Sequence, residues 1–207
     1  KRQKLMDILI AGATGKTGPR LVDQLKAKGH APIALVRESS DTGALPDDVA
    51  LRRGDLTDLE SGVCDGCDAV IFAAGSGGST GPEMTDKVDR DGAKRLIDLA
   101  ADAGVSRFVM LSSVGADDPD PDSELAHYLQ AKHEADEHLK ASGLSYAIVR
   151  PVSLTDDDGS RDMRFGEEAD VKGKAARGDV AAVLADAVED DEWTGKALVM
   201  QSILPDA

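Results

Sequence analysis

Three glycines spaced three residues apart, Gly12, Gly15 and Gly18, narrow the folds open to this chain more than any other feature. They follow an apolar run of strand length and open a helical pattern. The Gly-Lys-Thr within this stretch resembles the end of a triphosphate-binding P-loop, but that loop would need a glycine where Ile10 stands. The spacing and its strand–turn–helix context instead match a dinucleotide-binding turn. The alternative is that the glycines serve tight packing alone.

In a dinucleotide-binding turn the pyrophosphate lies at the helix N-terminus, where free N–H groups and the helix dipole favour negative charge. Pro19 is compatible with this first helical turn, because the donor that proline lacks is not needed there. The cofactor contacts expected from the turn are Gly12, Thr14, Gly15, Lys16, Thr17 and Gly18.

Apolar runs of strand length alternate with helical patterns along the chain. Strands are predicted at 5–12, 31–37, 49–55, 68–75, 107–113, 145–151 and 196–200, and helices at 20–29, 86–103, 124–143 and 179–189. Ser123 is the predicted cap of the third helix, and the polar segment 152–176 is predicted to be a loop. This alternation predicts an α/β fold with a doubly wound, mostly parallel sheet, the Rossmann fold. We expect a single domain over 1–207, with a small substrate-side segment from about 151 to 207.

The charge of the chain limits its partners. The sequence has 39 acidic against 24 basic side chains, a net charge of -15 spread along its length. Nucleic acid is therefore not expected to bind, because it needs clustered positive charge. An acidic shell is typical of proteins from a salt-loving, halophilic source, although ordinary acidic proteins also have one.

Cysteine content and hydropathy predict the compartment. Two cysteines fit a reducing interior, and no apolar run is long enough to span a bilayer or to form a secretory signal. We expect a cytoplasmic protein with no membrane partner, acting on a small-molecule substrate as a monomer or homodimer.

The end of the second predicted strand bears on the choice of cofactor. Arg37 stands there, about 20 residues after the glycine turn, where arginine accommodates the 2′-phosphate of NADP. Glu38 follows, and an acid at this place binds the ribose 2′-hydroxyl of NAD. Arg52 and Arg53, near the next strand end, favour NADP over NAD.

Further cofactor contacts are predicted after the third and fourth strands. Asp55 and Leu56 are expected to line the adenine pocket. Ala74, Gly75 and Ser76 are candidate contacts to ribose or pyrophosphate, the alternative being a surface loop.

A tyrosine and a lysine stand one helical turn apart, Tyr128 and Lys132. A tyrosine with its usual pKa near 10 is a poor base, but a neighbouring ammonium favours the tyrosinate. Ser112 and Ser113 end the fifth predicted strand and would present a hydroxyl to a substrate oxygen at the same rim. Together with the glycine turn, these residues form a moderately specific catalytic constellation.

These motifs resemble a known family. The segments "ILIAGATGKTG", "VIFAAGSG", "VDRDGAKRLIDLA", "RFVMLSSVGAD", "YLQAKHEADEHL" and "LSYAIVRP" are similar to those of atypical short-chain dehydrogenases/reductases, close to the small NAD(P)-binding proteins of the NAD-dependent epimerase/dehydratase subgroup. The resemblance implies that Ser113, Tyr128 and Lys132 occupy the catalytic triad positions and that Pro151 lines the nicotinamide pocket. Asp89 stands where larger relatives carry asparagine, and an ionised carboxylate accepts hydrogen bonds but donates none.

Other chemistry-bearing residues have weaker interpretations. Cys64 and Cys67 form a C-x-x-C, typical of a redox pair or half a zinc site, but a turn before the fourth strand is preferred and no metal site is predicted. Arg161 and Arg164 would meet an anionic substrate or form exposed salt bridges.

The leading hypothesis is an NADP-dependent oxidoreductase that exchanges a hydride with a small carbonyl or alcohol, a quinone or a flavin. A sugar-nucleotide epimerase or dehydratase is the alternative enzyme, although only 56 residues follow Pro151 to build a substrate lobe. A non-catalytic NADP(H)-binding redox sensor is the alternative outside catalysis.

Overall fold

A single mostly parallel sheet organises the chain. The computed structural model describes residues 4–75 and 80–204. Among these residues, eight strands pair in the order β3-β2-β1-β4-β5-β6-β10-β8. The strands are β1 (Asp7–Ala11), β2 (Ala31–Val36), β3 (Ala50–Arg53), β4 (Ala69–Phe72), β5 (Arg107–Leu111), β6 (Tyr146–Pro151), β8 (Met163–Phe165) and β10 (Lys196–Ser202). Every pair is parallel except β10 with β8. The predicted Rossmann fold in one domain is confirmed.

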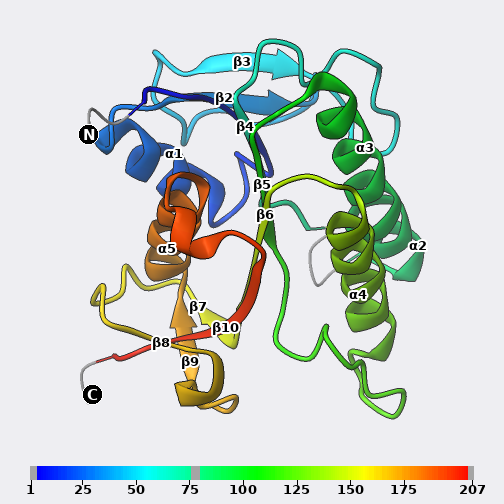
Figure 1. Ribbon diagram of the computed structural model, residues 1–207, viewed down its shortest axis with the longest axis vertical. Coiled ribbons are helices and arrows are strands. Elements are labelled where there is room, and N and C mark those ends of the chain that lie inside the picture. Colours follow the sequence, from blue (N-terminus) through cyan, green and yellow to red (C-terminus); the bar gives the residue numbers. More distant parts are fainter. Residues whose placement is uncertain (1–3, 76–79, 205–207) are drawn as a thin grey trace.

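Helices cover both faces of this sheet. The helices are α1 (Gly18–Ala27), α2 (Pro82–Met84), α3 (Ala93–Ala103), α4 (Ala126–Ala141) and α5 (Arg177–Glu189), with a π-helix, η1 (Thr85–Gly92), between α2 and α3 and short 3-10 turns η2 (Gly166–Glu168) and η3 (Asp191–Trp193). Figure 1 shows α1 and α5 on one side of the sheet, with α3 and α4 on the other.

Side chains that alternate along the strands build two separate cores. On β1, Ile8 and Ile10 belong to the core under α1 and α5, and Leu9 and Ala11 to the core under α3 and α4. Successive strand residues point to opposite faces, so a strand buried on both faces reads as continuously apolar. For this reason β4, with the sequence AVIF, was recognisable without any alternation.

The strand order reverses beside β1, whose neighbours are β2 and β4. The chain runs outward from β1 to β2 and β3, then crosses back to β4. In open α/β sheets ligands bind at such a switch point, outside the carboxyl ends of the strands. The glycine turn lies here, because it directly follows β1.

Several details differ from the sequence-based expectations. The predicted loop 152–176 contains β7 (Ser153–Thr155), β8, η2 and β9 (Lys174–Ala176), with β7 and β9 forming a two-stranded parallel sheet. Three-residue strands are too short to give a periodic pattern. The predicted helix at 86–103 starts as the π-helix η1, and α4 begins at Ala126, later than predicted. Ser123 does not cap α4, since its Oγ accepts a hydrogen bond from Leu125 N at 3.1 Å while Leu125 holds the N-cap position.

Candidate dinucleotide-binding site

The three glycines of the turn differ in what surrounds them. Gly12 has a φ of +87°, and a Cβ there would lie 2.5 Å from the backbone of Ala73. A Cβ on Gly18 would overlap the carbonyl oxygens of Gly12 and Ala13. A Cβ on Gly15 would meet only the Gly12 oxygen, at 3.5 Å. Gly12 and Gly18 are therefore required by the packing of the turn, whereas Gly15 leaves space in which a ligand can approach the backbone.

A cleft of about 340 Å³ runs along the carboxyl ends of β1 to β4. Its lining comes from the glycine turn, from the residues that end or follow β2, β3 and β4, and from η1 and the segment before it. The lining residues are Gly12, Thr14, Gly15, Leu35, Arg37, Ser40, Gly54, Asp55, Leu56, Thr57, Ala73, Ala74, Gly75, Thr80, Met84 and Val88. A cleft that crosses four strand ends suits an extended ligand with a phosphate over the turn.

Most of the predicted cofactor contacts lie in this cleft. Gly12, Thr14, Gly15, Arg37, Asp55, Leu56, Ala74 and Gly75 all line it. Thr17 and Gly18 are buried at the start of α1, and Pro151 is buried at the end of β6. Lys16 turns away to an ion pair with Asp156, 3.2 Å from Nζ to Oδ2. Ser76 lies outside the described residues.

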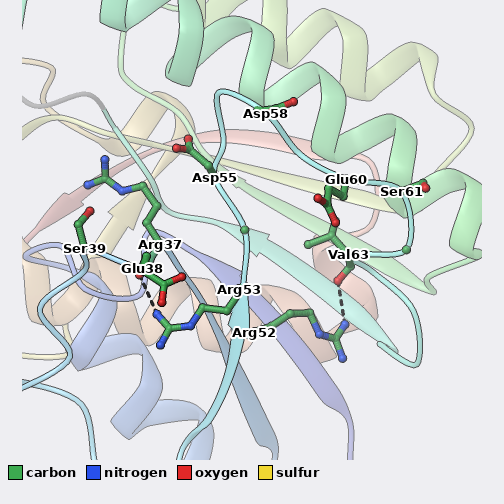
Figure 2. Close-up of a pocket in the computed structure, with 12 residues that line it drawn as sticks. Arg37, Glu38, Ser39, Arg52, Arg53, Asp55, Asp58, Glu60, Ser61 and Val63 are labelled. Carbon is green, nitrogen blue, oxygen red and sulfur yellow. Dashed lines mark hydrogen bonds between the residues drawn. The ribbon is translucent and has the colours of Figure 1, made fainter.

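A second cavity, of about 610 Å³, adjoins the cleft and shares Arg37, Gly54 and Asp55 with it. Figure 2 shows that the two arginines of β3 leave this region in different directions. Arg53 Nη1 donates to the Arg37 carbonyl at 2.9 Å. Arg52 Nη1 donates to Val63 O at 2.8 Å, so Arg52 holds the following turn in place. Arg37 is thus the exposed cation at the wall that the two cavities share.

Asp55 fixes the loop between these cavities. Its Oδ1 accepts hydrogen bonds from Thr57 N at 2.9 Å and from Thr57 Oγ1 at 2.8 Å. The backbone hydrogen bond from Thr57 is the main cause that lowers the pKa of Asp55, with a smaller contribution from the positive charge of Arg37. An ionised Asp55 therefore closes a tight turn at the floor of the cleft and positions Leu56 beside it.

The predicted catalytic residues stand on three elements, and none of them is among the residues that line the cleft. Ser113 follows β5 and is half-buried, with its Oγ donating to Val114 O at 3.1 Å. Tyr128 is half-buried near the start of α4. Lys132, one turn later, is only 2% exposed, and its Nζ lies 5.5 Å from the ring centroid of Phe72, the last residue of β4. Asp89 is buried in η1.

Lys132 lies over the last residue of β4, and Asp89 lies beside the lining residue Gly75. Phe72, beneath the Lys132 ammonium, directly precedes the lining residue Ala73. Asp89 Oδ1 lies 3.5 Å from where a Cβ on Gly75 would stand. Gly75 can thus have no larger side chain without contacting this carboxylate.

Several residues of the site escaped the sequence analysis. Met84, directly before the π-helix η1, and Val88, within it, line the cleft, and the wider turn of a π-helix is invisible in a hydropathy pattern. Ser112 does not face the site, because it is buried and its Oγ donates to Asp136 Oδ2 at 2.7 Å. The signal that could have separated Ser112 from Ser113 was the alternation of side chains along a strand, because successive residues point to opposite faces.

Other candidates lie away from the cleft. Cys64 and Cys67 are free thiols in the turn before β4, as preferred from the sequence. Arg161 forms an ion pair with Asp179, 2.9 Å from Nη1 to Oδ1, but the Asp179 side chain is fully buried, whereas the expected salt bridge was an exposed one. No helix within residues 4–75 and 80–204 combines the length and apolarity needed to cross a membrane.

The fold and the cleft define a class: a Rossmann-type α/β protein with an open cleft beside the glycine turn at its switch point. The model of the NAD(P)H-binding family matches residues 12–191, so the chain belongs to that family. The description of this family implies a nicotinamide cofactor.

Individual relatives agree with this assignment. YhfK of Bacillus subtilis, described as an uncharacterized sugar epimerase, is 36% identical over 200 residues that span 93% of this chain and 92% of YhfK. A solved structure of an NAD-dependent epimerase/dehydratase-like protein from Bacillus halodurans is 36% identical, with a TM-score of 0.90 over 96% of this chain and 95% of that one. The oxidoreductase ylbE of Lactococcus lactis is 28% identical, with a TM-score of 0.83 over 96% of this chain and 92% of its own.

Proposed function

We propose that the protein is an NADP-dependent oxidoreductase of the atypical short-chain dehydrogenase/reductase type. The observation that carries the proposal is the cleft, which has an open glycine at one end and the exposed guanidinium of Arg37 at the other. Guanidinium groups bind phosphate through paired hydrogen bonds, and Arg37 stands at the strand end where the 2′-group of the adenosine ribose lies in Rossmann proteins.

The residues around the cleft have separate roles in this proposal. The backbone at Gly15 holds the pyrophosphate. Lys132, which lies over the last residue of β4, binds the nicotinamide ribose. Ser113 holds the substrate oxygen, and Tyr128 gives that oxygen its proton as the carbon is reduced. The bound cofactor supplies the hydride. The buried carboxylate of Asp89 supplies a hydrogen-bond acceptor in place of an amide.

The substrate class in this proposal is a small carbonyl or alcohol, a quinone or a flavin. An epimerase or dehydratase is the second candidate, favoured by the description of YhfK, and it uses the same hydride chemistry transiently. A redox sensor is the third candidate and requires the cofactor cleft alone. We further propose that the protein is cytoplasmic, acts as a monomer or homodimer and comes from a salt-loving source, the last because of its net charge of -15.

The test is calorimetric binding of NADPH and of NADH, in low and in molar salt, to the wild-type protein and to Arg37→Ala. We expect tighter binding of NADPH than of NADH, and a loss of about ten-fold or more in NADPH affinity alone in Arg37→Ala. Arg164→Ala is the matched control, because Arg164 is an exposed arginine on β8, outside the lining of the cleft.

Two outcomes would contradict the proposal in different ways. A preference for NADH would assign the ribose contact to Glu38 and overturn the choice of cofactor. Absence of binding of either dinucleotide, by folded protein in both salt conditions, would remove the cofactor role of the cleft.

A further inference from the structure

Asp179, in the first turn of α5, is an acid with no exposed surface. Soluble proteins rarely bury an acid unless donors surround it. Its Oδ1 accepts hydrogen bonds from Arg161 N at 2.8 Å and from Arg161 Nη1 at 2.9 Å. Its Oδ2 accepts from Ser202 Oγ at 2.6 Å and from Ser160 N at 3.3 Å. Three of these four donors belong to the segment that joins β7 to β8.

The backbone of this segment is fitted closely around the carboxylate. A Cβ on Gly159, where φ is +81°, would lie 2.2 Å from Asp179 Cγ. A Cβ on Gly178 would lie 2.0 Å from the Asp158 carbonyl oxygen, so the segment also touches the start of α5. Arg161 has a φ of +62°, a conformation that costs a non-glycine residue energy and persists only where its surroundings enforce it. Asp179 supplies that constraint, because it accepts from both the N–H and the guanidinium of Arg161.

The same segment holds cations at the glycine turn and at the start of α1. We call residues 156–161 the acidic loop. Its Asp156 Oδ2 lies 3.2 Å from Lys16 Nζ, and its Asp158 Oδ1 accepts from Arg20 Nη1 at 2.6 Å. Arg20 also donates to the Asp156 carbonyl at 2.6 Å. Figure 1 shows α1 and α5 on the same side of the sheet, where they pack on each other, so α5 anchors the loop against the end of α1.

The carboxylates of the acidic loop compete with phosphate for these cations. Carboxylates and phosphates both accept charge-assisted hydrogen bonds from lysine and arginine. While Asp156 holds Lys16 and Asp158 holds Arg20, neither cation is available to a phosphate at the glycine turn. The loop also brings negative charge close to that turn, and like charges repel. The affinity of the turn for phosphates therefore depends on whether the loop stays docked.

We propose that Asp179 is a positioning residue that docks the acidic loop on the glycine turn and thereby limits the affinity of the cleft for a dinucleotide. The inference rests on the proposed function, in which the turn holds the pyrophosphate. Asp179 is not among the residues that line the cleft, so it acts through Asp156 and Asp158. Loss of its charge frees the loop and releases Lys16 and Arg20 towards the phosphates. Binding then tightens while the fold loses stability, whereas loss of a purely structural residue weakens both.

The test is Asp179→Asn, in which an NH₂ group that cannot accept replaces one oxygen. By NMR, the amide hydrogens of Ser160 and Arg161 should exchange at least about ten-fold faster than in the wild type. The Tm should fall by at least about 5 °C, because a buried acid loses its donors. In calorimetry, NADPH should bind about three-fold or more tighter. Asp186→Asn is the matched control: it removes the same charge from the half-buried face of α5, where Asp186 pairs with Lys28 at 2.7 Å, and should leave NADPH affinity within about two-fold.

A double-mutant cycle tests whether Asp179 acts through the loop. In a protein that already carries Asp156→Asn and Asp158→Asn, the further change Asp179→Asn should alter NADPH affinity by less than about two-fold, because the cations are already released. The same gain in both backgrounds would show that Asp179 acts by another route and would overturn the proposal.

The remaining outcomes also decide. Unchanged amide exchange in folded Asp179→Asn, or faster exchange with equal or weaker NADPH binding, would overturn the proposal. Should Asp179→Asn not fold, Arg161→Gly removes the guanidinium contacts with Asp179 and the Asp158 carbonyl and keeps the positive φ without strain. Faster exchange of Ser160 with tighter NADPH binding, despite the loss of a positive charge, would then support the proposal, and equal or weaker binding would overturn it.

Failure of the proposed function is distinguishable from failure of this inference. Amide exchange and thermal unfolding need no cofactor, so they report on the docking of the acidic loop by themselves. A wild-type protein that binds no dinucleotide contradicts the proposed function. A wild-type protein that binds NADPH, together with an Asp179→Asn variant that gains no affinity, contradicts only the role of Asp179.

Discussion

The ammonium of Lys16 lies 3.2 Å from Asp156 Oδ2, so an acidic loop 140 residues further along the chain holds the glycine turn. The same carboxyl group accepts from Arg177 Nη1 at 2.5 Å. Arg20 of α1 donates to Asp158 Oδ1 and to the Asp156 carbonyl, both at 2.6 Å. The segment after β7 is thus tied to the N-terminal end of α1, the expected position of the pyrophosphate.

Asp156→Asn is expected to tighten NADPH binding by about two- to five-fold. The substitution frees Lys16 to face the phosphates and removes a negative charge beside them, and the expected gain is small because exposed ion pairs of this kind are weak. Hydrogen bonding from Lys16 lowers the pKa of Asp156. The difference in NADPH affinity between variant and wild type is therefore largest near neutral pH. It vanishes as the pH falls through that lowered pKa, because the wild-type carboxyl is then also neutral. Calorimetry over a pH series measures it.

Asp157→Asn is the control for this experiment. It removes the same charge from the adjacent position, but Asp157 accepts from Thr155 Oγ1 at 2.8 Å and does not contact Lys16. Equal tightening in both variants would show that the effect is overall charge rather than the contact of Asp156 with Lys16.

Substitution of the three glycines should separate folding from cofactor binding. Gly12→Ala and Gly18→Ala place a Cβ against backbone atoms, at Gly12 with a positive φ as well, and should destabilise the protein by about 2 to 4 kcal/mol. Gly15→Ala meets only one backbone oxygen at 3.5 Å and should change stability by less than about 1 kcal/mol. Its methyl group would still stand where the pyrophosphate approaches, so NADPH affinity should fall at least ten-fold.

Thermal unfolding and calorimetry of the same three variants decide between the interpretations of the motif. A stable Gly15→Ala that binds NADPH as well as wild type does would mean that the glycines serve packing alone. A Gly12→Ala variant as stable as wild type would contradict the close approach to Ala73.

The sequence predicted the parts of this protein that depend on short-range patterns. The buried parallel strands were recognisable as continuous apolar runs, and the glycine turn as three positions with a fixed spacing between strand and helix. Arg52, counted from the sequence in favour of NADP, donates to Val63 O in a turn eleven residues later in the chain, a contact that no short-range pattern reports. Its neighbour Arg53 points to the other face of β3, as strand geometry requires.

Long-range contacts account for what the sequence analysis missed. The ion pair between Lys16 and Asp156 joins two residues that belong to no common motif. The hydrogen bonds from Ser112 and Arg150 to Asp136 form only when β5, β6 and α4 are packed together. The π-helix η1 depends on a shift in backbone hydrogen bonding that side-chain periodicity does not report.

Tyr128→Phe should separate an oxidoreductase from a redox sensor. Loss of the phenolic proton donor should lower turnover at least about a hundred-fold with any carbonyl substrate found by screening, while NADPH affinity stays within about two-fold. Tyr146→Phe is the matched control, because the chain has two tyrosines and Tyr146 packs in the core under α3 and α4. Undiminished turnover in Tyr128→Phe would remove the proposed proton donor and leave the fold and the cofactor site unaffected.

The C-x-x-C thiols should be inert in the folded protein. Burial is the main cause that raises the pKa of Cys64 to about 12, and burial also raises the pKa of Cys67 against the opposing effect of Arg52. Because only the thiolate is nucleophilic, iodoacetamide should alkylate Cys64 in native protein at least about a hundred-fold more slowly than in unfolded protein near neutral pH. The rate should rise as the pH is raised towards 12, where the thiolate forms.

Mass spectrometry of labelled Cys64→Ala and Cys67→Ala variants assigns each rate to one thiol. Rapid alkylation of Cys64 in folded protein, or a disulfide that forms reversibly and changes NADPH affinity, would restore a redox role for this turn.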